Sequence, residues 1–363
     1  MAKKLFEESN IQAIANAIRG KCGTTCGYKT CDMAEAIESI TTGSGDGNIT
    51  LRLDLLADYT YFPKVSRAIV QLMGSEGILT LDAETLDYSM FVYCFQGLCG
   101  MAFDASDVLD FSRVQLSSRL IQLLQNSTGG FYTHSMFSGG TTGGNYGNVI
   151  LPSWMTYLKP AGCGYMFQNS YLDTIPEFDT TYMGTTQAGY SRWYNSYMFK
   201  GSTISTIPTS ITKAMKYQVD PNAGSSTYAY GSDHFYAHAF EDCCALTKVE
   251  SLGVDTVFLD NVSSNLFINT FNKCTSLTSL TFEMNDDGTP ITASNWTNQT
   301  ITLTSTSSVY NHDSMVETIN SLPDVSGSGG TNTIKFTNSN GGSELTEEEI
   351  AVATARGWTI TLA

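Results

Sequence analysis

The chain has 363 residues, a formal net charge of −16 and 15% charged residues. An acidic chain repels the phosphates of DNA and RNA, so the composition argues against nucleic-acid binding as the main task. Hydrophobic residues make up 42% of the chain, which is too many for a disordered acidic polymer. We therefore expect folded domains, or one long repeat array, under a surface of small polar residues.

The first residues show no secretion signal. Lys3 and Lys4 are followed at once by charged and polar residues rather than by an apolar stretch. No segment of the chain holds 18 consecutive apolar residues, so we expect no membrane span. We expect a chain that is made in a cytoplasm and leaves it, if at all, by lysis or within a larger particle.

The first 48 residues predict two short helices and a glycine-rich link. The first helix follows Asn10 as its N-cap, and the second runs from about Cys31 to Ile40. A hairpin this small has too little core to stand alone, so we expect it to dock on another body. The apolar faces of the two helices are formed by Ile11, Ile14 and Ile18, and by Met33 and Ile37.

The middle of the chain mixes strand-like and helical patterns. Alternating leucines predict a strand within residues 49–62. Residues 114–124 predict a helix, and the Gly-, Ser- and Thr-rich stretch at 127–148 predicts a loop.

An internal repeat is the main signal in this sequence. GYMFQNSYLDTIPEFDT (164–180) matches SYMFKGSTISTIPTSIT (196–212), with an aliphatic residue five and eight positions after the Phe and a Pro nine after it. Later copies at 238–252 and 269–282 have one extra residue, and weaker copies surround Phe95 and Phe137. We predict a repeat core that contains Phe167, Phe199, Phe240, Cys243, Phe271 and Cys274.

The spacing within each copy predicts a tight turn that leads into a short strand. One copy cannot bury its own apolar face, whereas stacked copies can, which gives a solenoid with a ladder of short strands. The small Cys or Ser three residues after the Phe fits where neighbouring backbones approach closely. Ser170 and Ser202 fill this place in the first two good copies.

The nine cysteines are odd in number and irregularly spaced, so we expect them to be reduced and mostly buried. Two groups come nearest to a metal pattern. The first lacks the usual C-x2-C spacing, and repeat packing accounts for the second, so we expect no metal and no cofactor. The groups are Cys22, Cys26 and Cys31, and His234, His238, Cys243 and Cys244.

Two capping boxes predict helices near the C-terminus, one opened by Ser314 and one by Thr346. Arg356 falls in the last turn of the second helix, and Gly357 stands at its C-cap position. Trp358 and the residues after it predict a closing strand.

The repeat residues MFQNSYLDTIPEFDT and FNKCTSLTSLTF resemble the BspA-like class of leucine-rich repeats, over roughly residues 85–282. The insertion at 220–236 departs from that pattern. The resemblance implies an α+β fold: an irregular leucine-rich-repeat solenoid with short strands, an N-terminal helical hairpin and a C-terminal cap of helix and strand. The expected divisions are 1–48 (helical anchor and linker), 49–150 (mixed, β-rich connection with degenerate first repeats), 151–282 (repeats) and 283–363 (cap).

A second resemblance covers the N-terminus. NIQAIANAIRGKCGTTCGYKTCDMAEAIESI is similar to a segment that opens many phage tail and virion structural proteins of Gram-positive hosts. The ending LTEEEIAVATARGWTI looks like the cap that follows such repeats in tailed-phage and prophage proteins. These resemblances imply that the apolar faces at Ile11, Ile14, Ile18, Met33 and Ile37 anchor the chain in a virion.

Enzyme motifs are missing from the sequence: it has no G-x-S-x-G, no H-E-x-x-H, no P-loop and no dinucleotide-binding glycine pattern. The glycine-rich GGTTGGNYGN (139–148) lacks the Lys of a phosphate-binding loop. A glycosidase pair such as Asp173 with Glu177 stays open as an alternative, because carboxylates are plentiful.

Two aromatic clusters offer candidate binding residues, because exposed aromatics beside Ser, Asn and Gly suit contacts with sugars or proteins. Part of each cluster could instead be repeat core, as we expect for Tyr197. The candidates are Tyr190, Trp193, Tyr194, Tyr228, Tyr230 and Tyr236.

We therefore expect a non-enzymatic bacteriophage virion protein, of the tail-fibre or baseplate type, that binds the host cell surface. Its expected partners are other virion proteins, through the N-terminal segment, and a glycan or protein of the host surface. A homo-oligomer is expected, with a trimer favoured, because virion appendages gain avidity from multivalency. The alternatives are a purely structural tail, baseplate or head subunit, a bacterial surface adhesin, and a carbohydrate-active depolymerase.

Overall fold

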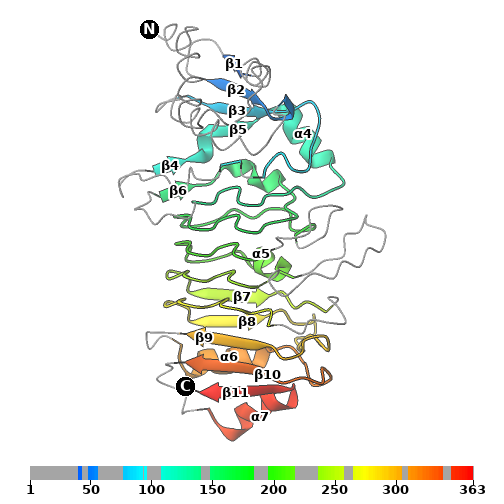
Figure 1. Cartoon of the computed structure of the whole chain (residues 1–363), viewed down its shortest axis with the longest axis vertical. Coiled ribbons are helices and arrows are strands. Elements are labelled where there is room, and N and C mark those ends of the chain that lie inside the picture. Colours follow the sequence, from blue (N-terminus) through cyan, green and yellow to red (C-terminus); the bar gives the residue numbers. More distant parts are fainter. Residues whose placement is uncertain are drawn as a thin grey trace, which may run out of the picture.

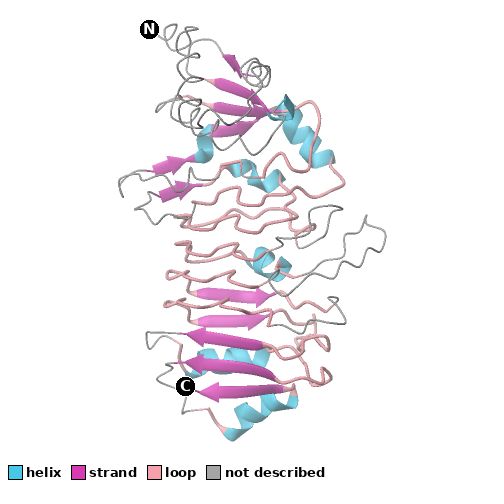
Figure 2. Ribbon diagram, viewed as in Figure 1, coloured by secondary structure: helices cyan, strands magenta, loops and turns pink. Residues whose placement is uncertain are grey.

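The structure is a computed structural model. It describes residues 40–42, 48–55, 77–92, 94–95, 108–139, 148–183, 195–216, 236–256, 265–304, 310–337 and 345–362. The chain forms an elongated stack, and its layers follow one another along the long axis in sequence order (Figure 1). Short strands occupy both ends of the stack, and turns and loops predominate between them (Figure 2).

The strands form small sheets with mainly parallel pairing. The largest joins β1 (Ile40–Thr42), β2 (Ile49–Arg52), β3 (Leu79–Asp82) and β5 (Val114–Leu116) in that order, with β1 antiparallel. The second joins β11 (Trp358–Leu362), β10 (Asn332–Thr337) and β9 (Thr300–Thr304), all parallel. Two parallel pairs complete the set: β4 (Val108–Asp110) with β6 (Asn148–Ile150), and β7 (Lys248–Leu252) with β8 (Ser279–Phe282).

The helices are short and lie beside the strands. The α-helices are α4 (Ser118–Asn126), α5 (Thr209–Ala214), α6 (His312–Ser321) and α7 (Glu347–Ala355). The 3-10 helices are η2 (Leu53–Leu55), η4 (Phe111–Arg113) and η5 (Ser153–Tyr157). Among the described residues, no helix is long and apolar enough to cross a membrane.

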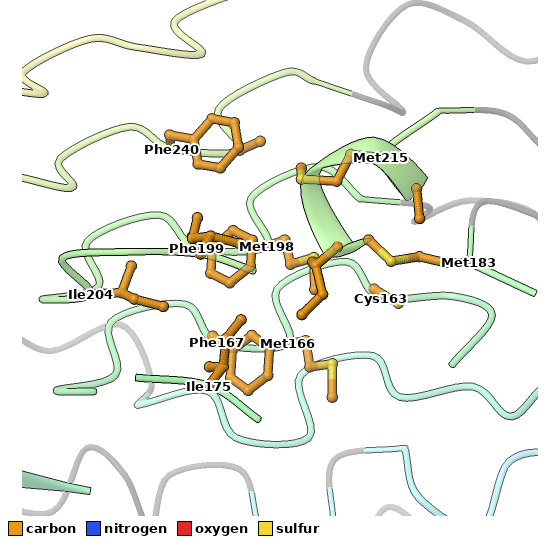
Figure 3. Packing of buried hydrophobic residues seen from close by; sticks show 14 of the residues in the cluster. Cys163, Met166, Phe167, Ile175, Met183, Met198, Phe199, Ile204, Met215 and Phe240 are labelled. Carbon is orange, nitrogen blue, oxygen red and sulfur yellow. The ribbon is translucent and has the colours of Figure 1, made fainter. Parts of the chain in front are cut away.

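A column of phenylalanine rings runs through the middle of the stack. Each ring is the centre of a tight run of turns, which we call a Phe segment. The centroids of neighbouring rings are 5.4 to 6.0 Å apart, and the ring planes are nearly parallel. Figure 3 shows three of these rings above one another, with methionines beside them. The Phe segments are centred on Phe95, Phe137, Phe167, Phe199, Phe240 and Phe271, and all six rings are buried.

Backbone hydrogen bonds join each Phe segment to the next. In the segment of Phe167, the N–H groups of Tyr165, Phe167 and Asn169 donate to carbonyls of the following segment at 3.2, 2.8 and 2.7 Å. The N–H groups between them donate within their own turns, as Met166 does to Cys163 at 3.0 Å. Alternate N–H groups therefore serve the stack and the turn, so the buried backbone is paired without regular strands. The same three-bond pattern joins the segments of Phe137 to Phe167, Phe199 to Phe240, and Phe240 to Phe271.

Left-handed backbone lies two residues before the Phe in the segments of Phe137, Phe167, Phe199, Phe240 and Phe271, and two residues after it in the last four of these. Before the Phe, Tyr165, Tyr197 and His238 have φ of 58°, 59° and 57°. After it, Gly201 and Asp242 have φ of 70° and 61°. Left-handed backbone is unfavourable for L-amino acids other than glycine. The hydrogen bonds and ring stacking between segments therefore stabilise these turns.

In three segments, the small residue three positions after the Phe donates a hydrogen bond to the preceding segment. The thiols of Cys243 and Cys274 donate to the carbonyls of Phe199 and Phe240 at 2.9 and 3.0 Å. Ser170 donates from the same place to the carbonyl of Phe137. At these three places a short polar side chain bridges the two backbones. Burial raises the pKa of the Cys274 thiol to about 12, which keeps this donor protonated.

Proline decides where the stacked segments form true strands. Nine residues after the Phe, Val249 and Leu280 pair with each other in β7 and β8. The two preceding copies are one residue shorter before this point, so Pro176 and Pro208 stand in register with Glu250 of β7, and no strand forms there. Proline lacks the N–H that a ladder needs, so these copies stay irregular and Pro208 instead precedes α5.

Three predicted elements are wrong in detail. Residues 114–124 are not one helix: 114–116 pair with β3, and α4 begins after Ser117, whose side chain accepts from the N–H of Leu120. Ser314 does not cap α6, because Asn311 accepts its N–H at 3.0 Å and the helix starts at His312. Ile40 lies in a strand rather than at a helix end, since its run of β-branched residues pairs with β2.

The predicted helix and closing strand near the C-terminus are present, but the C-cap residue of α7 is Arg356 rather than Gly357. Thr346 and Glu349 form the reciprocal capping box of α7, Gly357 has φ of 82°, and the predicted closing strand is β11. Arg356 has a further role, because its guanidinium donates to the carbonyls of Ile319 and Asn320 at the C-terminal end of α6. It thereby satisfies carbonyl groups that the end of α6 leaves without a helical partner.

Candidate functional site

Half-buried rings form a row along the turn edge of the stack. We call Tyr165, Tyr197 and His238 the aromatic row, since each stands two residues before the Phe of its segment. The centroids of Tyr165 and Tyr197 are 4.6 Å apart, and those of Tyr197 and His238 are 4.4 Å apart, with nearly parallel planes. His134 meets Tyr165 edge-on at 5.3 Å. The left-handed backbone at these positions turns three side chains from successive segments onto one line.

Charged side chains hold the His238 end of the row. Glu241 is buried and accepts from Lys200 at 2.5 Å, and His238 Nδ1 lies 2.6 Å from its Oε2. Lys200 Nζ also lies 5.4 Å from the ring centroid of Tyr197, within cation–π range. Burial by itself raises the pKa of Glu241. Hydrogen bonds from Lys200, His238 and Asn272 lower this pKa by more than burial raises it, so the carboxylate stays ionised.

The aromatic row is suited to binding a ligand through ring edges and polar tips. The faces of Tyr197 are covered by its neighbours, so the edges and polar tips of the rings are what the row can present. Stacked rings lose little conformational freedom on binding, which favours contacts with sugars or proteins. Burial lowers the pKa of His134 to about 4, so this ring is neutral at physiological pH.

The predicted binding residues divide between two outcomes. Tyr236 is fully buried, its hydroxyl donates to the carbonyl of Gly253 at 2.6 Å, and its ring stacks on Phe267 at 4.7 Å. The prediction that Tyr236 is a ligand contact is therefore wrong, because its place four residues before Phe240 points inward. The other candidates lie outside the described residues; they are Tyr190, Trp193, Tyr194, Tyr228 and Tyr230.

The predicted anchor residues and the first cysteine group also lie outside the described residues. This applies to Ile11, Ile14, Ile18, Met33 and Ile37, to Cys22, Cys26 and Cys31, and to His234. Among the residues that the structure describes, no group of three or more His, Cys, Asp and Glu could hold a metal ion.

The alternative carboxylate pair lies on the surface. Asp173 and Glu177 are both exposed, and neither lines the cavity described below.

Sequence reasoning missed Lys200 and Glu241 as partners of the aromatic row. Both stand directly after the Phe of their segments, so the repeat register contained the signal. Because adjacent segments stack in register, these two side chains become neighbours although 41 positions separate them in the sequence.

Comparisons with known proteins add no relative. Scans against family models, curated proteins and solved structures each found no match to this chain.

Proposed function

We propose that this chain is a non-enzymatic bacteriophage virion protein, built as a solenoid of BspA-like leucine-rich repeats. The observation that carries the proposal is the junction between Phe segments, where three backbone hydrogen bonds and one stacked ring pair recur from copy to copy. Repeats of this kind make a long scaffold that displays side chains at fixed intervals. The N-terminal and C-terminal resemblances supply the virion part of the proposal.

Within a virion, we favour a tail-fibre or baseplate appendage that contacts the host surface. The aromatic row supports this role, because it presents rigid rings on one edge of the scaffold. The net charge of −16 keeps such a subunit soluble before assembly and leaves host contact to aromatic and neutral polar groups. A symmetric oligomer, with a trimer favoured, would multiply weak contacts into firm attachment. A purely structural tail, baseplate or head subunit is the second candidate.

Mass spectrometry of purified virions tests the location. We expect the chain at many copies per particle, and its absence would refute the virion proposal. Deletion of residues 1–48 should abolish incorporation and leave a soluble, folded body; a truncated chain that still assembles would refute the anchor.

Sedimentation with isolated host cell walls tests attachment. Tyr197→Ala should reduce the bound fraction, whereas Tyr157→Ala, at an exposed tyrosine away from the row, should not. Equal binding by both variants would refute the role of the row. Release of reducing sugar from the walls would favour the depolymerase instead, and binding by intact bacteria that display the chain would favour the adhesin.

A further inference from the structure

A groove opens on the side of the stack where two helices flank one pair of strands. Helix α5 packs on β7, and α6 packs on β8 (Figure 1). Between them lies a cavity of about 610 Å³, a size typical of small-ligand sites. Ser251 and Thr281 come from the strands, Lys213 from α5, and Glu317 and Asn320 from α6.

The α5 side of the groove carries a surplus positive charge. Glu283 lines the cavity with a side chain only 9% exposed, and it pairs with both Lys213 and Lys216. The Lys213 ammonium is the looser partner at 3.6 Å, and the Lys213 side chain is 53% exposed. One buried carboxylate cannot neutralise two ammonium groups, so Lys213 can bind an anionic group as well.

The α6 side of the groove is negative. Asp313 and Glu317 are four residues apart on this helix and therefore share a face. Ser279 donates to Oε2 of Glu317 at 2.7 Å, which leaves Oε1 to accept from a ligand. The groove therefore opposes carboxylates on one side to an ammonium on the other.

Neutral groups complete the lining. In the described part of the chain, neither the Ser251 hydroxyl nor the Asn320 side-chain amide makes a hydrogen bond. Met284 and Val316 add apolar surface, and Met284 is 40% exposed. A few converging polar groups around an apolar patch are the usual composition of a ligand site.

We propose that this groove binds a zwitterionic saccharide unit, with its ammonium at Glu317 and Asp313 and its anionic group at Lys213. Sugar hydroxyls pair with Ser251 and Asn320, and the C–H face of the ring packs on Met284. The charge pattern comes from the groove alone, whereas the choice of a surface saccharide rests on the proposed host attachment. The groove is a second contact, separate from the aromatic row.

Titration of the purified full chain by ligand-observed NMR tests the site with four probes: muramic acid (ammonium and carboxylate), glucosamine (ammonium), glucuronic acid (carboxylate) and glucose (neither). Muramic acid should bind most tightly, with a Kd on the order of 1 mM. Glu317→Gln should weaken muramic acid and glucosamine about tenfold, as for loss of one charge-assisted hydrogen bond. Lys213→Met should weaken muramic acid and glucuronic acid but not glucosamine.

The matched controls are Lys248→Met and Glu250→Gln. Lys248 is 56% exposed and pairs with Glu250 at 3.6 Å, which copies the surroundings of Lys213, yet neither residue lines the groove. Both controls should bind like the unchanged chain. Equal binding of the four sugars, no binding of any, or equal effects of site and control variants would overturn the proposal. A failed sugar titration would leave the mass spectrometry of virions unaffected. Binding of muramic acid without sedimentation on cell walls would count against host attachment alone.

Discussion

Gly201→Ala tests whether the left-handed turn after each Phe is required. Gly201 has φ of 70°, and its N–H donates to the carbonyl of Glu241 at 2.7 Å. A Cβ added there would lie 2.2 Å from Oδ1 of Asn169, the residue at the same place in the preceding segment. The substitution therefore combines backbone strain with a steric contact.

The two costs can be separated. Left-handed backbone costs an L-residue about 1–2 kcal/mol, and pushing the Asn169 side chain off its rotamer costs about 0.5–1.5 kcal/mol. Gly201→Ala should therefore lower the free energy of unfolding by about 1.5–3.5 kcal/mol. Gly288→Ala is the matched control, because Gly288 has φ of 78° but no atom within 4 Å of an added Cβ, so it should lose about 1–2 kcal/mol.

Urea unfolding followed by circular dichroism gives the comparison, and hydrogen exchange at residue 201 reports the local bond to Glu241. In an Asn169→Gly background, Gly201→Ala should cost only as much as Gly288→Ala does. A loss below about 0.5 kcal/mol, which ordinary surface substitutions show, would refute the left-handed turn at Gly201.

Three further predictions concern polar groups that are buried or half-buried. Within the described part of the chain, both polar atoms of the fully buried Asn195 side chain lack partners, so Asn195→Cys should raise the free energy of unfolding by about 1–3 kcal/mol; a lower urea midpoint would contradict this. A hydrogen bond from Arg52 lowers the pKa of Asp54 from 3.8 to about 2, so this carboxylate stabilises the fold above pH 4. About 2 kcal/mol of stability should be lost between roughly pH 4 and pH 2, and an Asp54→Asn variant whose acid unfolding curve matched the unchanged chain would rule this out. Cys243→Ser should change stability by about 1 kcal/mol or less because the hydroxyl keeps the bond to Phe199, whereas Cys243→Val should cost about 1–3 kcal/mol, and equal thermal midpoints would contradict the bond.

Local sequence patterns predicted helices and strands correctly where only one capping or strand pattern was present in the segment. The capping box at Thr346 and the strand after Gly357 were predicted correctly, because their residues bond to near neighbours. Near Ser314, both Asn311 and Ser314 are residue types that can cap a helix. Asn311 is the N-cap of α6, because it lies three residues earlier and its side chain accepts the N–H of Ser314. The helix predicted from Val114 was shortened because pairing with β3 outweighs the helical pattern over its first residues.

The candidate binding site was harder to predict. Tyr236 belongs by composition to an aromatic cluster with small polar neighbours, and nothing in that composition distinguishes an inward ring from an outward one. Its position four residues before Phe240 decides the direction, since that place points into the core. Tyr197, expected in the core, instead lies half-buried in the aromatic row.

The sequence by itself determined the period of the molecule. The recurrence of Phe, a small Cys or Ser, and spaced aliphatic residues is a local property, because each copy needs the same turn and the same buried residues. Only the tertiary structure decided which residues of different copies meet. Stacking places Lys200 against Glu241 and Tyr197 against His238. It also creates a groove whose charged lining comes from α5, from α6 and from Glu283, the residue after β8. Such contacts depend on how successive copies align in space, which no single copy specifies.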